Sequence, residues 1–384
     1  MKLPYWRLSG FYFCYFATLG AFLPFWSLYL KQIGFTSTEI GELTAMLVAT
    51  KVVAPHLWSW LADKRGRCLG LIRITTLFSM LLFGGFLIQH DYQWVAAVTV
   101  AFSFFWNATL PQFEAATLLH LKAEPQRYSR IRLWGSVGFI VAVLGIGRFL
   151  DDFNIEWLPW IIAGLLAINW LMALITPEVI KSQRPVAAGS VFKVLCKPEI
   201  LAFFAVYMLL QVAHGPYYVF YSVYLQQNGY SATFTGMLWA LGVCAEIGVF
   251  YWMFGLLKRI SLRSLLLASL ALSMLRWLMI AYGTESLAII VAAQLLHAAS
   301  FGLAHVVAIQ LLHQYFGEAH QSKAQGLYSS ISFGLGGMLG SFYSGYCWDR
   351  IGGDLVFVIA ALACGLALII AFIGVARQKP VTLG

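Results

Sequence analysis

Five charged residues and three histidines stand among apolar residues in this 384-residue sequence. The acids are Glu114 and Glu246, the cations are Lys51, Arg132 and Arg276, and the histidines are His214, His297 and His305. An imidazole can take up and release a proton near neutral pH, and a cation can hold an anion. Because an unpaired charge is costly to bury, we expect these residues to pair or to bind a ligand.

Three sets of these charges allow both a structural and a functional interpretation. Glu246 and Arg276 lie on successive apolar segments, and their opposite charges imply mutual compensation, as a static brace or as a proton relay. Glu114 and Arg132 flank a polar loop. They could form a structural ion pair at two helix ends, or they could belong to a binding site. Lys51 lies mid-segment, about 18 Å from either end at 1.5 Å per residue, and fits either an ion pair or a cavity cation.

The stretch QLLHAASFGLAH, residues 294–305, carries Gln294, His297 and His305 inside an apolar run. In an α-helix, two residues eight positions apart are separated by about 80° in projection and about 12 Å along the axis. The two histidines then cannot share one site, although both can face the same cavity. Each could be a hydrogen-bonding residue of the packing, but together with Gln294 they favour a polar track that responds to pH.

Several functional classes are excluded by missing motifs. The sequence has no HExxH, GxSxG or paired-Asp motif within an apolar segment, so an intramembrane enzyme is not expected. The stretch GLGGMLG has the wrong spacing for a phosphate-binding loop, and no P-loop is present, which excludes self-contained use of ATP. The six scattered cysteines form no CxxC pair and predict neither a disulfide framework nor a metal site. We expect no cofactor.

Composition assigns these residues to a polytopic membrane protein. The chain is 60% hydrophobic and 11% charged, and its apolar blocks are long enough to cross a ~30 Å hydrocarbon core as helices. The first block is too long and too aromatic for a cleavable signal peptide. We predict an all-α fold with twelve transmembrane helices, at residues 5–31, 38–62, 69–89, 93–119, 131–150, 157–176, 199–227, 232–257, 262–282, 286–315, 322–347 and 353–376.

The distribution of Lys and Arg predicts the orientation. With both termini in the cytoplasm, 20 of the 25 Lys and Arg residues fall on the cytoplasmic side. The net charge of +9 reflects this bias, so a nucleic-acid partner is not expected. The longest polar interruption predicts a cytoplasmic linker at 177–198, between an N-terminal bundle at 1–176 and a C-terminal bundle at 199–384, each of six helices.

The two halves repeat each other. A shift of 195 residues aligns the first span with the seventh and gives twelve identities in 34 positions, from Tyr12 with Tyr207 to Ala45 with Ala240. Transporters built from such parallel repeats bind their substrate between the two bundles. Glycines in the fifth and eleventh spans, among them Gly135, Gly138 and Gly340, are expected to let helix backbones approach closely.

A cytoplasmic loop resembles a signature of the major facilitator superfamily. The residues LADKRGR, 61–67, lie between the second and third predicted spans, where that superfamily carries its conserved loop. The resemblance implies that Asp63 and Arg67 act as a conformational latch between the two bundles. It also implies a monomer.

Within the superfamily, the chain is similar to the lactose-permease-like proton symporters. Asn107, Pro111 and Glu114, with Arg132 eighteen residues after Glu114, resemble the acid–base pair that holds the sugar. Phe139 stands in the place of the sugar-stacking tryptophan, and three residues match the coupling acid, arginine and histidine: Glu246, Arg276 and His297. The chain departs from the permease at Ser300, where a proton-bearing glutamate is expected, at Gln294, where a lysine is expected, and at Lys51.

The phenylpropionate permease group is a closer match. Six stretches resemble it: FLPFWSLYL (22–30), IRLWGSVGF (131–139), QVAHGPYY (211–218), GVCAEI (242–247), LRW (275–277) and QLLHAASFGLAH (294–305). This resemblance implies a bacterial inner-membrane carrier that imports 3-phenylpropionate or a related aromatic acid with protons. The buried charges agree with it, because three cations against two acids leave one positive charge for a monovalent anion.

The sequence therefore leads to one hypothesis with named roles. A small organic anion is imported by alternating access, driven by the proton gradient in the lipid bilayer. Substrate-binding residues are expected to be Lys51, Glu114, Arg132, Phe139, His214, Tyr217 and Tyr218. Proton-coupling residues are expected to be Glu246, Arg276, His297 and His305. The alternatives are a proton-coupled sugar or nucleoside symporter of the same fold and a membrane sensor that binds without transport.

Overall fold

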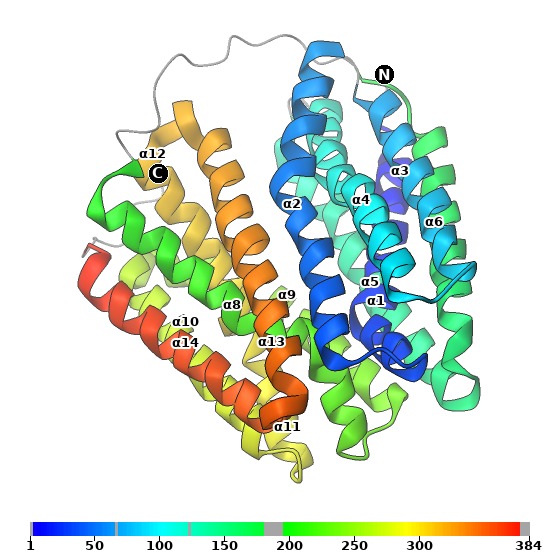
Figure 1. The fold of residues 1–384 in the computed structure, drawn as a ribbon. Helices are drawn as coiled ribbons and strands as arrows, with labels where there is room; N and C mark the ends of the chain where they lie inside the picture. Colours follow the sequence, from blue (N-terminus) through cyan, green and yellow to red (C-terminus); the bar gives the residue numbers. More distant parts are fainter. Residues whose placement is uncertain (1–2, 66–67, 122–123, 180–194, 377–384) are drawn as a thin grey trace. The chain divides into compact units, whose positions relative to one another are not determined.

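The computed structural model describes residues 3–65, 68–121, 124–179 and 195–376, which form helices joined by short turns. No strand occurs among these residues. They divide into two compact units: residues 1–185 with 230–237, and residues 186–229 with 238–384 (Figure 1). Most of the predicted linker, from residue 180 to residue 194, lies outside the described residues.

Unit 1 contains six long helices and the start of a seventh. They are α1 (Tyr5–Gln32), α2 (Ser37–Arg65), α3 (Leu69–Phe83, continued by a 3-10 turn at Gly84–Leu87), α4 (Tyr92–Leu121), α5 (Tyr128–Asp152), α6 (Leu158–Ile175) and the first turns of α9 (Ala232–Arg259). Asp151 accepts hydrogen bonds from the backbone N–H groups of Ala232 and Thr233, at 2.8 and 3.1 Å. Its carboxylate thus caps α9, whose first N–H groups have no partner within the helix.

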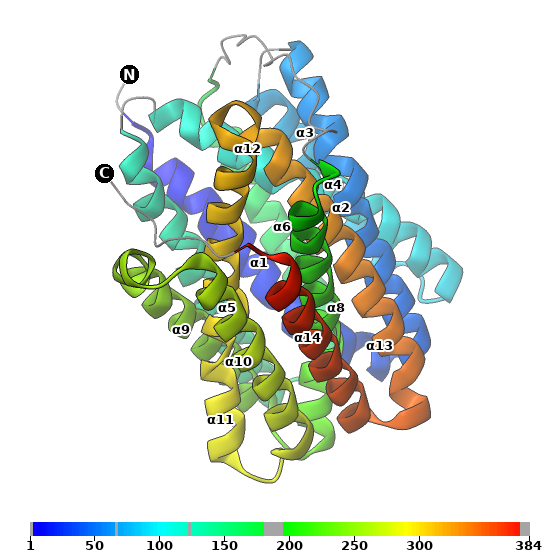
Figure 2. The same ribbon diagram turned by 90° about the vertical axis from the view of Figure 1, so that its left-hand side faces the viewer.

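Unit 2 contains the remaining helices. They are α8 (Pro198–Gln227), the rest of α9, α10 (Leu262–Tyr282), α11 (Leu287–Leu295), α12 (Ala304–Tyr328), α13 (Gly337–Ile351) and α14 (Gly353–Gly374). Helix α8 lies beside both α13 and α14 (Figure 2). Two π-helical segments, Ala298–Leu303 and Ser329–Gly336, connect α11 to α12 and α12 to α13.

Eleven of the described helical segments are long and apolar enough to cross a membrane. They correspond to eleven of the twelve predicted spans. The predicted span at 322–347 is helical as well, through the end of α12, the second π-helical segment and α13. Its many Ser, Gly and Tyr residues lower its mean hydropathy, which explains why it is not among the eleven. The all-α membrane fold is confirmed.

Glycines bring two pairs of helices into backbone contact, as predicted. In unit 1, a Cβ on Gly138 would lie 2.2 Å from the Phe13 oxygen, so α5 packs directly against α1. In unit 2, a Cβ on Gly215 would lie 2.2 Å from the carbonyl carbon of Gly340, so α8 packs directly against α13. Because the 195-residue shift aligns α1 with α8, the repeat in the sequence is also a repeat of helix contacts.

Candidate functional site

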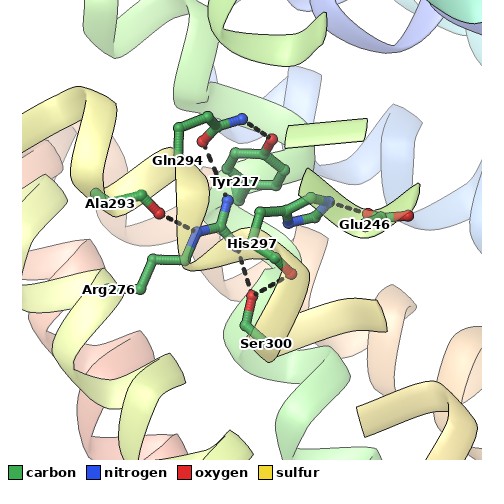
Figure 3. Close-up of polar contacts among 7 residues, drawn as sticks. All are labelled: Tyr217, Glu246, Arg276, Ala293, Gln294, His297 and Ser300. Atoms are coloured by element: carbon green, nitrogen blue, oxygen red, sulfur yellow. Dashed lines mark hydrogen bonds and ion pairs between the residues drawn. The ribbon is translucent and has the colours of Figure 1, made fainter. Parts of the chain in front are cut away.

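A buried guanidinium stands at the centre of a polar cluster in unit 2. Arg276 on α10 is 0% exposed. Its Nε donates to the Ala293 oxygen at 3.2 Å, its Nη1 to the Ser300 hydroxyl at 3.0 Å and its Nη2 to Gln294 Oε1 at 3.4 Å (Figure 3). All three acceptors are neutral. These hydrogen bonds use three of the five N–H donors of Arg276, but they do not cancel its charge.

Two aromatic rings complete the surroundings of this cation. The Arg276 Cζ lies 4.2 Å from the ring centroid of Tyr217 and 4.4 Å from that of Trp277. The amide of Gln294 donates to the Tyr217 hydroxyl at 2.7 Å, which fixes the Tyr217 ring relative to α11. A cation over an aromatic face is stabilised by the electrons of the ring. The site therefore holds a positive charge with neutral groups and aromatic rings.

The carboxylate that we expected to pair with Arg276 is paired with a histidine. Glu246 Oε1 lies 2.6 Å from His297 Nε2, and both side chains are largely buried (Figure 3). A contact this short between a carboxylate and an imidazole places a proton between the two groups. His297 Nδ1 is buried without a hydrogen-bond partner among the described residues. Glu246 and His297 thus form a unit that can hold or release one proton.

Gly242 allows α9 to lie close enough for this contact. A Cβ on Gly242, one turn before Glu246, would lie 2.9 Å from Gln294 Nε2 and 3.1 Å from His297 Cδ2. A Cβ on Gly302 would lie 3.5 Å from Glu246 Cγ, an ordinary contact, so Gly302 imposes no such restriction. No role was expected for Gly242 from its residue type alone. The signal was present in the spacing of Gly242 and Glu246, which places both on one face of a helix.

Three aromatic rings of the 294–305 stretch, those of His297, Phe301 and His305, form a continuous row. The rings of His297 and Phe301 stack at 5.6 Å and 14°, and those of Phe301 and His305 at 6.3 Å and 7°. The His305 Nδ1 lies 3.5 Å from the Tyr328 hydroxyl. Between the histidines, Ala298–Leu303 is π-helical. The wider i→i+5 turn changes the angle per residue, so the expected 80° separation does not apply.

His214 lies fully buried on α8. Its Nδ1 is 2.7 Å from the Leu210 oxygen and must donate, because a carbonyl can only accept. Its Nε2 has no partner among the described residues. The imidazole packs edge-on against Trp277 at 5.0 Å and stacks on Tyr218 at 5.8 Å. His214, Tyr217 and Tyr218, which we expected in one site, therefore lie together around Arg276 and Trp277.

The second acid–base pair lies in unit 1. Arg132 Nε on α5 is 3.7 Å from Glu114 Oε1 on α4, and the two side chains are 30% and 37% exposed. The Arg132 Cζ lies 3.9 Å from the ring centroid of Phe16 and 5.6 Å from that of Tyr12, both on α1. The expected proximity of Glu114 and Arg132 is present, although the contact is longer than a charge-assisted hydrogen bond.

The remaining expected residues are more scattered. Lys51 is half-buried on α2 and forms no hydrogen bond or ion pair with another described residue. Phe139 is buried on α5, and its backbone oxygen would lie 2.8 Å from a Cβ on Gly20. Asp63 is exposed near the end of α2, and Arg67 lies outside the described residues. No group of three His, Cys, Asp or Glu residues suited to a metal ion occurs in the described part of the chain.

Comparisons with known proteins assign the chain to a family of membrane transporters. The profile of the "MFS_1 like family" matches residues 5–359. The "Probable 3-phenylpropionic acid transporter" of Escherichia coli (strain K12) is 30% identical, over 93% of this chain and 94% of that protein. The "Maltose permease" of Geobacillus stearothermophilus is 25% identical, over 94% and 92%. The crystal structure of the nucleoside transporter NupG shares the fold, with a TM-score of 0.82, 19% identity and 97% and 98% coverage.

Proposed function

The chain belongs to the MFS_1-like family of major facilitator transporters, and we propose that it is a proton-coupled importer of a small aromatic carboxylate. It is a membrane transporter and not an enzyme. The substrate class is suggested by the relative named for 3-phenylpropionic acid, which matches nearly the full length of both chains. We place the protein in a bacterial inner membrane, where bacterial relatives suggest it, and we propose a monomer. The Lys and Arg distribution favours both termini in the cytoplasm.

One observation carries the preference for an anion: two cations within the helices have no carboxylate partner. Arg276 is fully buried and bonded to neutral acceptors, and Lys51 forms no ion pair with another described residue. The two acids within the helices are occupied elsewhere, Glu114 beside Arg132 and Glu246 with His297. A surplus of positive charge at membrane depth favours binding of a monovalent anion.

The pair of Glu246 and His297 provides the group for proton coupling. Coupling requires that the proton be held more tightly when substrate is bound than when it is absent. Glu246 and His297 can meet this requirement because their shared proton lies close to the uncompensated charge of Arg276. Removing the proton would leave Glu246 as a counter-ion for Arg276, and an anionic substrate competes for the same positive charge. Substrate binding at Arg276 therefore favours the protonated pair, and loss of the proton favours release of the substrate.

The test is uptake of radiolabelled 3-phenylpropionate into proteoliposomes under an inward proton gradient, with and without a protonophore. Liposomes without protein run alongside, because the protonated acid crosses bilayers unaided. We expect gradient-driven accumulation that Glu246→Gln removes and that Glu156→Gln, at an exposed turn, leaves intact. Flux equal to that of empty liposomes, or Glu246→Gln accumulation equal to that of the unmodified protein, would contradict the proposal.

A neutral sugar or nucleoside is the second candidate, because relatives and neighbours of this chain include a maltose permease and a nucleoside transporter. The two candidates differ at Lys51. A Lys51→Met substitution should abolish uptake of an anion and should spare the affinity for a neutral substrate. Competition by unlabelled maltose or xanthosine, without competition by 3-phenylpropionate, would favour the second candidate.

A further inference from the structure

The guanidinium of Arg132 lies over the face of an aromatic ring in unit 1. Its Cζ lies 3.9 Å from the ring centroid of Phe16, a half-buried residue on α1. A guanidinium is planar and stacks on aromatic faces, whereas an ammonium group has no plane to orient. Phe16 therefore fixes the orientation of the hydrogen-bond donors of Arg132 in addition to stabilising its charge.

A glycine provides the space for this arrangement. A Cβ on Gly135, one turn after Arg132 on α5, would lie 2.7 Å from Arg132 Nη1 and 2.7 Å from Phe16 Cδ2. Any other side chain at position 135 would therefore displace the guanidinium, the ring or both. Elsewhere on α5, a Cβ on Gly145 would have no atom within 4 Å, so the restriction belongs to position 135 and not to the helix as a whole.

The donors of Arg132 are partly open to a ligand. Glu114 Oε1 lies 3.7 Å from Arg132 Nε, which is longer than a charge-assisted hydrogen bond. The Arg132 side chain is 30% exposed, whereas Arg276 is fully buried. Two parallel N–H donors on a fixed plane match the two oxygens of a carboxylate. The ammonium group of Lys51 is a point charge on a flexible chain, so it cannot distinguish a carboxylate from another anion by its shape.

We propose that Phe16 and Gly135 are positioning residues that make Arg132 selective for a carboxylate. This inference rests on the proposed function and deepens it, because it separates two roles among the cations. Within unit 1, Lys51 favours negative charge in general, and Arg132 recognises the planar, two-oxygen shape of the group. Phe139, which we expected to stack on the substrate, is buried where α5 packs against α1, and its contact with a substrate stays a prediction.

The test measures equilibrium binding to the purified full-length protein in nanodiscs, without a proton gradient. The ligands are 3-phenylpropionate and its neutral isostere 3-phenylpropanamide, and the readout is the ratio of their dissociation constants. We expect the unmodified protein to prefer the carboxylate by roughly tenfold or more. Phe16→Leu, which keeps an apolar side chain but removes the ring, should lower that preference by roughly 2- to 30-fold.

Matched variants separate orientation from packing. Phe16→Tyr retains the ring face and should retain the preference. Gly135→Ala should lower it, and Gly145→Ala on the same helix should not. The predicted loss is confined to the carboxylate, so a Phe16→Leu protein that binds neither ligand, or the same ratio in all four variants, would overturn the inference.

The outcome is also separable from that of the proposed function. Carboxylate preference that depends on Phe16, found together with no gradient-driven uptake, would support this inference and refute proton coupling. Gradient-driven uptake with a ratio that only Lys51→Met changes would support the proposed function and refute this inference. An unmodified protein that binds acid and amide equally would refute both.

Discussion

Gly242→Ala tests whether close contact between α9 and α11 holds the pair of Glu246 and His297 in place. The added Cβ would lie 2.9 Å from Gln294 Nε2 and 3.1 Å from His297 Cδ2, both shorter than an ordinary contact. Neither neighbour is a free side-chain end. Gln294 is bonded to the Tyr217 hydroxyl at 2.7 Å, and His297 to Glu246 at 2.6 Å. The methyl group can therefore be accommodated only by disturbing one of those contacts.

The expected change in the free energy of unfolding follows from two opposing effects. Overpacking a tight interface costs about 1–3 kcal/mol, and replacing Gly by Ala inside a helix contributes about 1 kcal/mol of stability. The free energy of unfolding of Gly242→Ala should therefore be about 0–2 kcal/mol lower than that of the unmodified protein. Gly248→Ala, six residues further along α9, places its Cβ 3.7 Å from Trp252 Cζ3, an ordinary contact. It should keep the propensity gain, so the two variants should differ by about 1–3 kcal/mol.

The measurements are thermal unfolding of the detergent-solubilised protein and gradient-driven uptake. We expect Gly242→Ala to unfold a few degrees below Gly248→Ala, since about 1 kcal/mol shifts Tm by about 2–4 °C in a unit of this size. Uptake should fall in Gly242→Ala alone, because only there is His297 displaced from Glu246. Equal unfolding temperatures together with equal uptake in the two variants would refute this account of the site.

Three further substitutions test other contacts, each by the change in thermal unfolding. Tyr217→Phe leaves the buried amide of Gln294 without its acceptor and should destabilise by about 1–3 kcal/mol; a smaller loss would mean that the amide finds another partner. Arg276→Lys cannot reproduce the three hydrogen bonds of the guanidinium and should destabilise by about 2 kcal/mol or more, and an unchanged Tm would show that charge alone suffices. Asp151→Asn removes the charge that caps α9 and should cost about 0.3–1 kcal/mol, whereas Asp152→Asn, in an exposed pair with Arg148, should have no measurable effect. Equal losses of stability in Asp151→Asn and Asp152→Asn would show that Asp151 does not stabilise the start of α9.

The sequence predicted more of the fold than of the site. Membrane spans could be located because apolar blocks of about twenty residues have few alternatives to transmembrane helices. Glu114 and Arg132 could be paired because they flank one short loop, which brings neighbouring helix ends together. Glu246 and Arg276 were expected to pair on charge alone, yet Glu246 meets His297. The partner of Glu246 is decided by how closely α9 approaches the segment that carries Gln294 and His297. Gly242 permits this close approach because it has no side chain.

The membrane class, the helical segments, the internal repeat and the positions of the buried charges were determined by the sequence itself. Each follows from composition or from spacing along one chain, and hydrogen bonding of the backbone in an apolar solvent leaves the helix as the outcome. Only the tertiary structure decided which groups meet. The ring row of His297, Phe301 and His305 runs along a π-helical turn, which no single residue type specifies. The stacking of Arg132 on Phe16 joins helices more than a hundred residues apart, and such contacts arise from packing between helices rather than from the pattern within either one.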